Sequence, residues 1–345
     1  MSTPSSQQER LVGLDALRGL AALAVVLFHY STSYEMQVGH ADPLPFHFYI
    51  GNYGVQLFFL ISGFVIFMTL ERTRRASDFV VSRFSRLFPA YWSAILITLA
   101  TVSLIGLPQQ QLPARDLVAN FSMIQEFFGF RSLDGSYWTL EIELFFYVQM
   151  LFWFVVGQLE RIRWIIGAWL LMVLLFGFFQ QQGWHFSYSV RELLILEYIP
   201  FFAMGILFYR IHTRPAETLV NALLIGACLL VIGAVYRPDF FWVALVCVAI
   251  FTAFLRGALD WLGSRPLAFL GTISYSLYLL HQAIGFALIY RMERLGLPGP
   301  VACVLTIACV ILLAWGLNVL VEKPAMRWLR DRWRNRMRAV QAPQH

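Results

Sequence analysis

Charged residues are scarce in this chain: they make up 13% of its 345 residues, whereas hydrophobic residues make up 59%. Average soluble proteins carry about 25% charged residues, because charge is what covers their surface. The mean hydropathy of +0.64 agrees with this imbalance. The composition excludes an ordinary soluble globular protein and predicts an integral membrane protein.

Cysteine is nearly absent, and the few cysteines form no CxxC pair. They lie inside apolar runs, at Cys228, Cys247, Cys303 and Cys309. Such positions are typical of small core residues rather than of a disulfide or a metal site, so we expect no metal. The sequence also lacks internal repeats, which argues mildly against a transporter built from two related halves.

Long apolar segments are abundant, and about 17–25 residues are enough to cross a bilayer. They predict an all-α polytopic protein of about ten transmembrane helices. The segment 117–130 is apolar but interrupted by polar residues, so we expect a re-entrant or interfacial piece there. The predicted spans are 14–34, 51–70, 87–106, 137–157, 164–181, 193–210, 217–235, 240–256, 267–290 and 299–321.

The distribution of basic residues predicts the orientation. With a cytoplasmic N-terminus, most basic residues fall on the cytoplasmic side, as the positive-inside rule requires, and both termini are cytoplasmic. The domains we expect are a cytoplasmic segment 1–10, a membrane domain 11–322 and a basic cytoplasmic tail 323–345. The first apolar run has no cleavage site after it, so we expect a retained helix rather than a signal peptide. Of the 26 basic residues, those that fall on the extracytoplasmic side in this orientation are Arg115, Arg131, Arg191, Arg237, Arg291 and Arg294.

The basic tail alternates arginines with Trp328 and Trp333. A nucleic-acid partner is one interpretation of this pattern. A juxtamembrane segment resting on anionic lipid explains it without further assumptions, so we expect anionic lipid and no nucleic acid.

The first predicted helix carries Asp15, Arg18 and His29. Arg18 and His29 are eleven residues apart, which returns to within about 20° of the same helix face over about 16 Å of rise. Ionisable groups at membrane depth are costly and usually face a functional cavity. A packed, hydrogen-bonded His29 is the alternative interpretation, which the arginine on the same stripe disfavours.

Two further groups are candidates for chemistry. Arg83 and Arg86 follow the second predicted span one helical turn apart, a spacing that suits one phosphate group, although plain positive-inside charge explains them equally well. Glu143 lies one turn inside the fourth predicted span and needs a partner at that depth. We predict that this partner is His29, whose imidazole would then accept a hydroxyl proton, whereas an ion pair with an arginine is the alternative.

The remaining polar positions in apolar helices are weaker cavity candidates: Ser62, Tyr275 and His281, together with Asp15. Membrane serines more often bond to a neighbouring helix than act as nucleophiles. Glu322-Lys323-Pro324 is expected to end the tenth helix, because proline stops a helix.

Six motifs in order resemble those of the acyltransferase family 3 membrane proteins, over roughly residues 11–330. They are Leu14-Asp15-Ala16-Leu17-Arg18-Gly19 with His29, the segment 54–64, Arg83-Phe84-Ser85-Arg86, Trp138-Thr139-Leu140-Glu141-Ile142-Glu143, the segment 273–281, and Glu322-Lys323-Pro324. Ala16 and Gln56 stand where Gly and Asp are common in that family, and neither is a proposed catalytic group.

The resemblance implies a ten-helix O-acyltransferase of the bacterial cytoplasmic membrane. The donor would be cytoplasmic acetyl-CoA, and the acceptor a hydroxyl of an extracytoplasmic or lipid-linked glycan such as O-antigen (lipopolysaccharide) or exopolysaccharide. The family's functional positions fall on Arg18, His29, Arg83, Arg86 and Glu143. The chain resembles the stand-alone type without an esterase-like domain.

The mechanism stays open between His29 as general base and an acyl-histidine intermediate. Oligomeric state is also open, and a homo-oligomer is one option. A proton-coupled transporter or flippase for a glycan or anion is the competing function, since it could use the same ionisable groups as a relay. A structural scaffold is disfavoured, because it would not need three ionisable groups at membrane depth.

Overall fold

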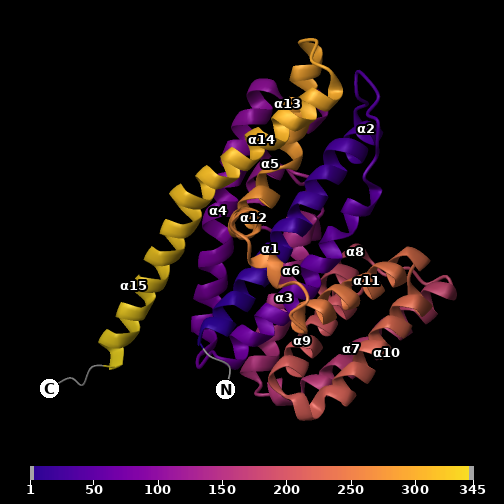
Figure 1. The fold of residues 1–345 in the computed structure, drawn as a ribbon, viewed down its shortest axis with the longest axis vertical. Helices are drawn as coiled ribbons and strands as arrows, with labels where there is room; N and C mark the ends of the chain where they lie inside the picture. Colours follow the sequence, from indigo (N-terminus) through magenta and orange to yellow (C-terminus); the bar gives the residue numbers. More distant parts are fainter. Residues whose placement is uncertain (1–3, 342–345) are drawn as a thin grey trace.

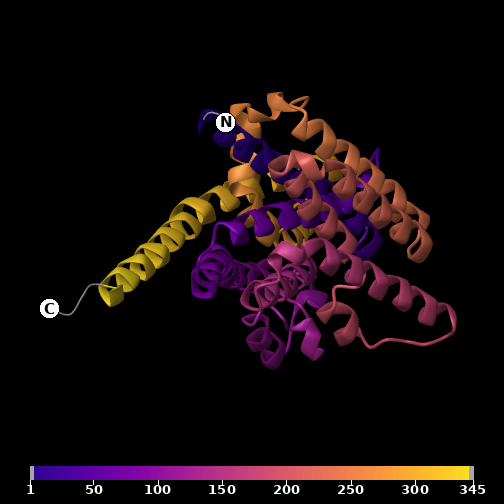
Figure 2. The same ribbon diagram turned by 90° about the horizontal axis from the view of Figure 1, so that it is seen from below.

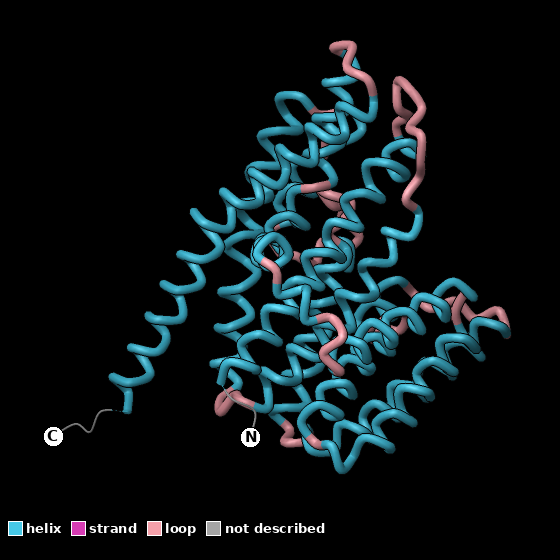
Figure 3. The backbone as a smooth tube through the Cα atoms, in the orientation of Figure 1, coloured by secondary structure: helices cyan, strands magenta, loops and turns pink. Residues whose placement is uncertain are grey.

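In the computed structural model of this protein, the backbone is described over residues 4–341 and the side chains over residues 12–339. Within that range every regular element is helical and none is a strand (Figure 3). Short 3₁₀ and π turns join the helices. The helices are α1 (Pro4–Phe28), α2 (Tyr34–Gln37), α3 (Gly54–Glu71), α4 (Ala76–Ile105), α5 (Ala114–Asn120), α6 (Trp138–Val155), α7 (Ile162–Gln181), α8 (Tyr188–Leu193), α9 (Ile199–Thr213), α10 (Thr218–Val235), α11 (Pro238–Leu255), α12 (Arg265–Leu280), α13 (Gln282–Arg294), α14 (Gly299–Leu317) and α15 (Lys323–Gln341).

The described helices confirm an all-α integral membrane protein. Eight of them are long and apolar enough to cross a bilayer, and the bent pair α12–α13 brings the number to nine. The remaining predicted span, 193–210, corresponds to α9, which has only 15 residues. All side chains from Ile199 to Arg210 are buried, so α9 runs through the interior of the bundle rather than along its surface.

The helices form one upright bundle with a second group beside it (Figure 1). The most extensive contacts are those of α1 with α12 and of α3 with α9. Helices α7 and α10 cover α9 on the other side. Helix α15 diverges from the side of the bundle and runs downward away from it, as the view from below also shows (Figure 2). The start of α1 and the end of α15 lie at the same end of the bundle, as the predicted orientation requires.

Glycines allow the two tightest helix pairs to approach. A Cβ atom at Gly19 would lie 2.5 Å from the backbone nitrogen of Gly271, and one at Gly63 would lie 2.1 Å from the carbonyl oxygen of Phe202. Small residues at crossing points are how membrane helices pack closely, because lipid offers no hydrophobic drive for association. Arg18 and Ser62 directly precede two of these glycines, so the same contacts fix where their side chains lie.

The predicted continuous span 267–290 is wrong, because α12 and α13 meet at His281 with a 73° bend. The backbone groups freed by the break find side-chain partners. The Tyr30 hydroxyl donates to the His281 carbonyl oxygen at 2.7 Å, and the Ala283 amide donates to Asp134 Oδ2 at 2.7 Å. Such side-chain partners are what a helix end buried in protein needs. Apolar periodicity does not record these distant partners.

Pro324 does not end the last helix, contrary to the prediction. The chain passes from α14 through a π-helical turn, Asn318–Glu322, directly into α15. Proline cannot donate the helical hydrogen bond and crowds the carbonyl four residues earlier. The wider π turn in front of it offers a way to accommodate that defect without breaking the helix.

The interrupted segment 117–130 is irregular, as its polar residues suggested. It comprises the end of α5 and short turns, and its buried Asn120 side chain is bonded to backbone groups. Asn120 Nδ2 donates to the Arg131 carbonyl oxygen, and Asn120 Oδ1 accepts from the Leu133 amide. Non-helical backbone in a membrane protein is tolerated where protein groups satisfy it in this way.

Gly63→Ala is expected to lower the melting temperature of the purified protein in detergent, because the new Cβ cannot fit against the α9 backbone. Overpacking of this kind costs about 1–3 kcal/mol. The matched control is Gly167→Ala in α7, where nothing lies within 4 Å of the added carbon. Equal melting temperatures for the two variants would contradict the proposed packing.

Candidate functional site

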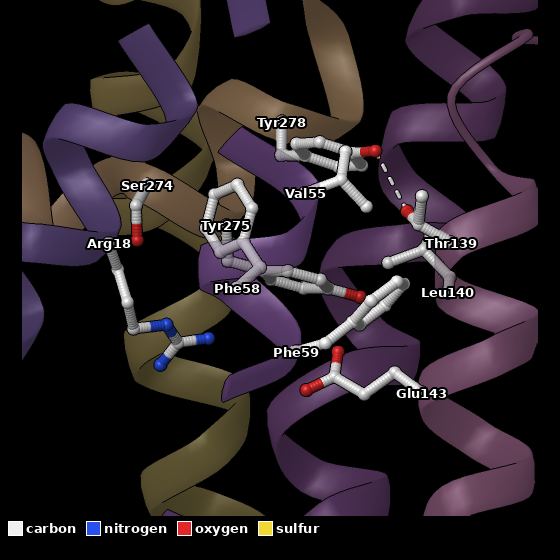
Figure 4. Close-up of a pocket in the computed structure, with 10 residues that line it drawn as sticks. All are labelled: Arg18, Val55, Phe58, Phe59, Thr139, Leu140, Glu143, Ser274, Tyr275 and Tyr278. Carbon is white, nitrogen blue, oxygen red and sulfur yellow. Dashed lines mark hydrogen bonds between the residues drawn. The ribbon is translucent and has the colours of Figure 1, made fainter. Parts of the chain in front are cut away.

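A narrow cavity of about 40 Å³ lies between α1, α3, α6 and α12. Figure 4 shows Arg18 entering it from one wall and Glu143 from the opposite wall, with Tyr275 between them. Apolar and aromatic side chains form most of the remaining lining. This volume has room for a few water molecules, so the cavity suits a slender chain rather than a sugar ring. Its full lining is Arg18, Val55, Phe58, Phe59, Thr139, Leu140, Glu143, Ser274, Tyr275 and Tyr278.

Glu143 is bound by two hydroxyl groups and not by a histidine. Ser62 Oγ donates to Glu143 Oε1 at 2.7 Å, and the Tyr147 hydroxyl donates to the same oxygen at 2.6 Å. No hydrogen bond joins Glu143 to His29 in the part of the chain that the structure describes. The predicted contact between them is therefore absent, because Glu143 lies on the cavity wall facing Arg18, nearer that end of α1.

His29 has a different neighbour, His281. His29 Nδ1 lies 2.9 Å from the Val25 carbonyl oxygen and 3.3 Å from His281 Nε2. His281 Nδ1 lies 2.7 Å from the Tyr278 carbonyl oxygen. A carbonyl oxygen only accepts, so in each ring the hydrogen is on Nδ1.

This assignment leaves Nε2 of each neutral imidazole with its lone pair. His281 Nε2 faces the Nδ1–H of His29 and holds that ring in place. His29 Nε2 has no hydrogen-bond partner among the described residues, so it is the nitrogen that can accept a proton or attack an electrophile. His29 also begins a π-helical turn, His29–Ser33, a local geometry that often occurs at functional sites.

Asp134 fixes the end of the broken helix beside this pair, and the sequence did not single it out. Its side chain is 1% exposed and accepts from the Ala283 amide and from the amide and hydroxyl of Ser136. Burial raises the pKa of this carboxyl above its usual range, and the three hydrogen bonds oppose that shift. An acidic residue followed by Gly135-Ser136, just before the Tyr137-Trp138 motif, is the signal that could have identified it as a turn and capping residue.

Arg83 and Arg86 lie within α4, which begins at Ala76 and so starts eleven residues before the predicted span 87–106. Each guanidinium stands over a tyrosine ring at the cavity: Arg83 is 5.9 Å from the ring centre of Tyr147, and Arg86 is 5.7 Å from that of Tyr275. Tyr275 lines the cavity, and Tyr147 donates to Glu143, which also lines it, so the two arginines lie just outside the cavity wall. Cation–π contacts of this kind hold a guanidinium without neutralising it.

Arg83 and Arg86 differ in whether a carboxylate neutralises the charge of the guanidinium. Arg86 Nη1 lies 2.6 Å from Glu322 Oε1, and Glu322 is 1% exposed. Glu322 Oε2 also accepts from Ser276 Oγ at 2.7 Å. Arg83 forms no ion pair within the described residues, and its Nε is buried without a partner. Arg86 is thus partly structural, whereas Arg83 keeps its capacity for an anion.

Known proteins are similar to this chain over most of its length. The sequence profile of the acyltransferase 3 family, described as an acyltransferase domain, matches residues 11–319. That match covers most of the chain. The chain belongs to the acyltransferase 3 family. It is therefore a membrane acyltransferase, and its many apolar helices agree with that assignment.

Two curated proteins are similar over most of this chain. "Acyltransferase MdmB" of Streptomyces mycarofaciens is 25% identical over 93% of this chain and 92% of its own length. "Putative peptidoglycan O-acetyltransferase YrhL" of Bacillus subtilis strain 168 is 26% identical over 92% of this chain. The alignment covers 55% of YrhL, so this chain matches about half of that protein. No solved structure matches.

The residues that the sequence predicted as weaker cavity candidates lie at different places in this acyltransferase. Ser62 donates to Glu143, and Tyr275 lines the cavity while its hydroxyl donates to the Leu87 carbonyl oxygen at 2.9 Å. Asp15 is exposed and is not among the residues that line the cavity. His281 belongs to the histidine pair. Among the described residues, no group of three or more His, Cys, Asp or Glu side chains could hold a metal ion.

Removal of the Glu322 carboxylate tests the buried ion pair of this acyltransferase. Glu322→Ala is expected to destabilise the protein by about 3–5 kcal/mol, because it leaves Arg86 without its buried counter-charge. Thermal unfolding in detergent measures this loss. Glu160→Ala is the control, since the Glu160–Arg214 pair is largely exposed at the glutamate and is worth about 0–1 kcal/mol. If Glu322→Ala unfolds at the same temperature as wild type, the Arg86–Glu322 ion pair does not stabilise the fold.

Proposed function

We propose that this acyltransferase moves acetyl from cytoplasmic acetyl-CoA to a hydroxyl of an extracytoplasmic or lipid-linked glycan, such as O-antigen or exopolysaccharide, at the bacterial cytoplasmic membrane. The observation that carries the proposal is the line of groups from the α4 arginines, through the narrow cavity, to the histidine pair. The name of YrhL supports O-acetylation as the chemistry.

The acetyl-CoA donor binds with its phosphates at the α4 arginines and its thioester at the histidine pair. The pyrophosphate binds at Arg83, which has no carboxylate partner in the described chain, with Arg86 beside it. Arginine suits phosphate because its planar fork donates two parallel hydrogen bonds. The thin pantetheine arm then passes through the cavity, past Arg18. Tyr278 lines that cavity and its ring lies 5.3 Å from that of His281, so the thioester end reaches the histidine pair.

His29 Nε2 acts as the general base in this proposal. It takes the proton of the acceptor hydroxyl as the oxygen attacks the thioester carbonyl carbon. The carbon–sulfur bond then breaks, and the leaving thiolate takes the proton back from the imidazolium. His281 is a positioning residue, because its Nε2 accepts from the Nδ1–H of His29 and thereby holds the ring in place, while the Val25 carbonyl oxygen fixes the tautomer. Glu143 supports the cavity wall through Ser62 and Tyr147 and does not act on His29.

The outward face of α15 suits anionic lipid. Arg332 and Arg336 are exposed there, and Trp328 is exposed beside them. The Arg332 guanidinium lies 4.8 Å from the Trp328 ring centre. Basic residues next to a membrane gain about 1 kcal/mol each from an anionic surface. This surface would hold α15 against the bilayer while leaving the donor site free.

Substitution of His29 tests the base. His29→Ala is expected to lower acetyl transfer to a glycan acceptor about 10²–10⁴-fold, the usual contribution of general catalysis, with acetyl-CoA affinity unchanged. Transfer of radiolabelled acetyl in proteoliposomes and equilibrium binding measure the two quantities. His185→Ala, on an exposed loop, is the control.

His281→Gln separates positioning from catalysis. It is expected to lower kcat less than His29→Ala and to leave KM for acetyl-CoA unchanged. Near-normal transfer by His29→Ala would overturn the base assignment. Covalently acetylated His29 in wild type would replace the general-base step with an acyl-histidine route.

Substitution of Arg83 tests the donor end. Arg83→Ala is expected to weaken acetyl-CoA binding by about tenfold or more, since charge-assisted hydrogen bonds are worth about 1.5–3 kcal/mol. Isothermal titration of purified protein in detergent measures the affinity. Arg115→Ala is the matched control, because that side chain is 80% exposed and its neighbour Asp116 is its ion-pair partner. Folded wild-type protein that binds no acetyl-CoA would refute the proposed donor.

A further inference from the structure

A basic groove, separate from the cavity, lies between the start of α4 and the side of α15. Its volume is about 630 Å³, within the range of small-molecule sites. Figures 1 and 2 show the reason for the opening: α15 diverges from the bundle as it leaves α14. We call this the α4–α15 groove. Its arginines are Arg74, Arg75, Arg330, Arg334 and Arg338.

The groove carries a strong positive charge with little to balance it. Asp78 is the one carboxylate among its lining residues, and its Oδ1 accepts from the Trp333 indole nitrogen at 2.7 Å. Arg334 also pairs with Asp331 on the same helix. Arg74, Arg75 and Arg338 have no ion pair in the described part of the chain. A concave surface of this kind attracts a ligand with several negative charges.

Arg330 connects the groove to the α4 arginines through hydrogen bonds. Arg330 Nε donates to Ser85 Oγ at 3.2 Å, and Arg330 Nη2 donates to the Ser82 carbonyl oxygen at 3.3 Å. Ser82 and Ser85 directly precede Arg83 and Arg86. Arg330 therefore joins the groove to the point where the proposed function places the donor pyrophosphate. The Trp333 indole, fixed by Asp78, supplies an aromatic wall in the same groove.

We propose that the α4–α15 groove binds the phosphate-bearing adenosine end of the acyl-CoA donor, with its arginines taking the 3′-phosphate. This inference rests on one part of the proposed function, namely that acetyl-CoA is the donor. The order of sites matches the order of groups in that donor: groove, Arg83 and Arg86, cavity, histidine pair. The C-terminal helix is then part of the donor site and not only a membrane anchor.

An anionic lipid headgroup also carries phosphate, so the test must separate the two sources. The purified chain is titrated with CoA and with 3′-dephospho-CoA, which differ only in the phosphate assigned to the groove. Wild type is expected to bind CoA at least tenfold more tightly. In Arg75→Ala and Arg334→Ala that preference should fall towards one, while the affinity for 3′-dephospho-CoA stays as in wild type.

Arg336→Ala is the matched control, because Arg336 is exposed on α15 and does not line the groove. It should keep the full preference. Wild type without any preference, or groove variants that retain it, would overturn the groove assignment while leaving acetyl-CoA as the donor. Loss of binding to phosphatidylglycerol vesicles with an unchanged CoA preference would assign the groove to lipid and also overturn it. Wild type that binds neither nucleotide would refute the proposed function itself.

Discussion

The buried carboxylate of Asp134 is the interaction on which the rest of the site depends. By accepting the Ala283 amide, it satisfies a donor that the break between α12 and α13 would leave unbonded in the protein interior. The break in turn brings His281 to a helix end, where its Nδ1 satisfies the Tyr278 carbonyl and its Nε2 faces His29. Without that cap, an unbroken helix would carry His281 elsewhere, and His29 would lose the neighbour that holds its ring in place.

The site separates its charges along the bundle. Arginines gather between the start of α4 and the side of α15, whereas neutral imidazoles occupy the other end of α1. Arg83 lies over an aromatic ring, Arg86 pairs with a carboxylate, and Arg330 donates to a serine hydroxyl. Such a gradient suits a donor whose phosphates are charged and whose reactive thioester is neutral. It also lowers the cost of the site, since the charged groups stay near one end of the bundle and few ionised groups lie at membrane depth.

Much of this could be predicted from the sequence, because apolar run length fixes helix number and local spacing fixes which residues share a helix face. The spans, the Arg18–His29 stripe and the arginine pair on one turn all follow from such local rules. The predicted Glu143–His29 contact is absent, because it depended on how α1 and α6 pack, which local spacing does not record. The bend at His281 and the continuation through Pro324 depend on Asp134, Tyr30 and a π turn, whose effects cross between distant segments.

The most direct test of the account is a structure of the protein with a non-hydrolysable analogue of acetyl-CoA in which the thioester sulfur is displaced from the carbonyl by a methylene group. The account predicts that the analogue's phosphates lie at Arg83 and Arg86 and that its carbonyl carbon lies beside His29 Nε2, about 3–4 Å from a bound acceptor oxygen. An analogue whose phosphates lie at the histidine end, or whose carbonyl stays outside the cavity, would contradict it.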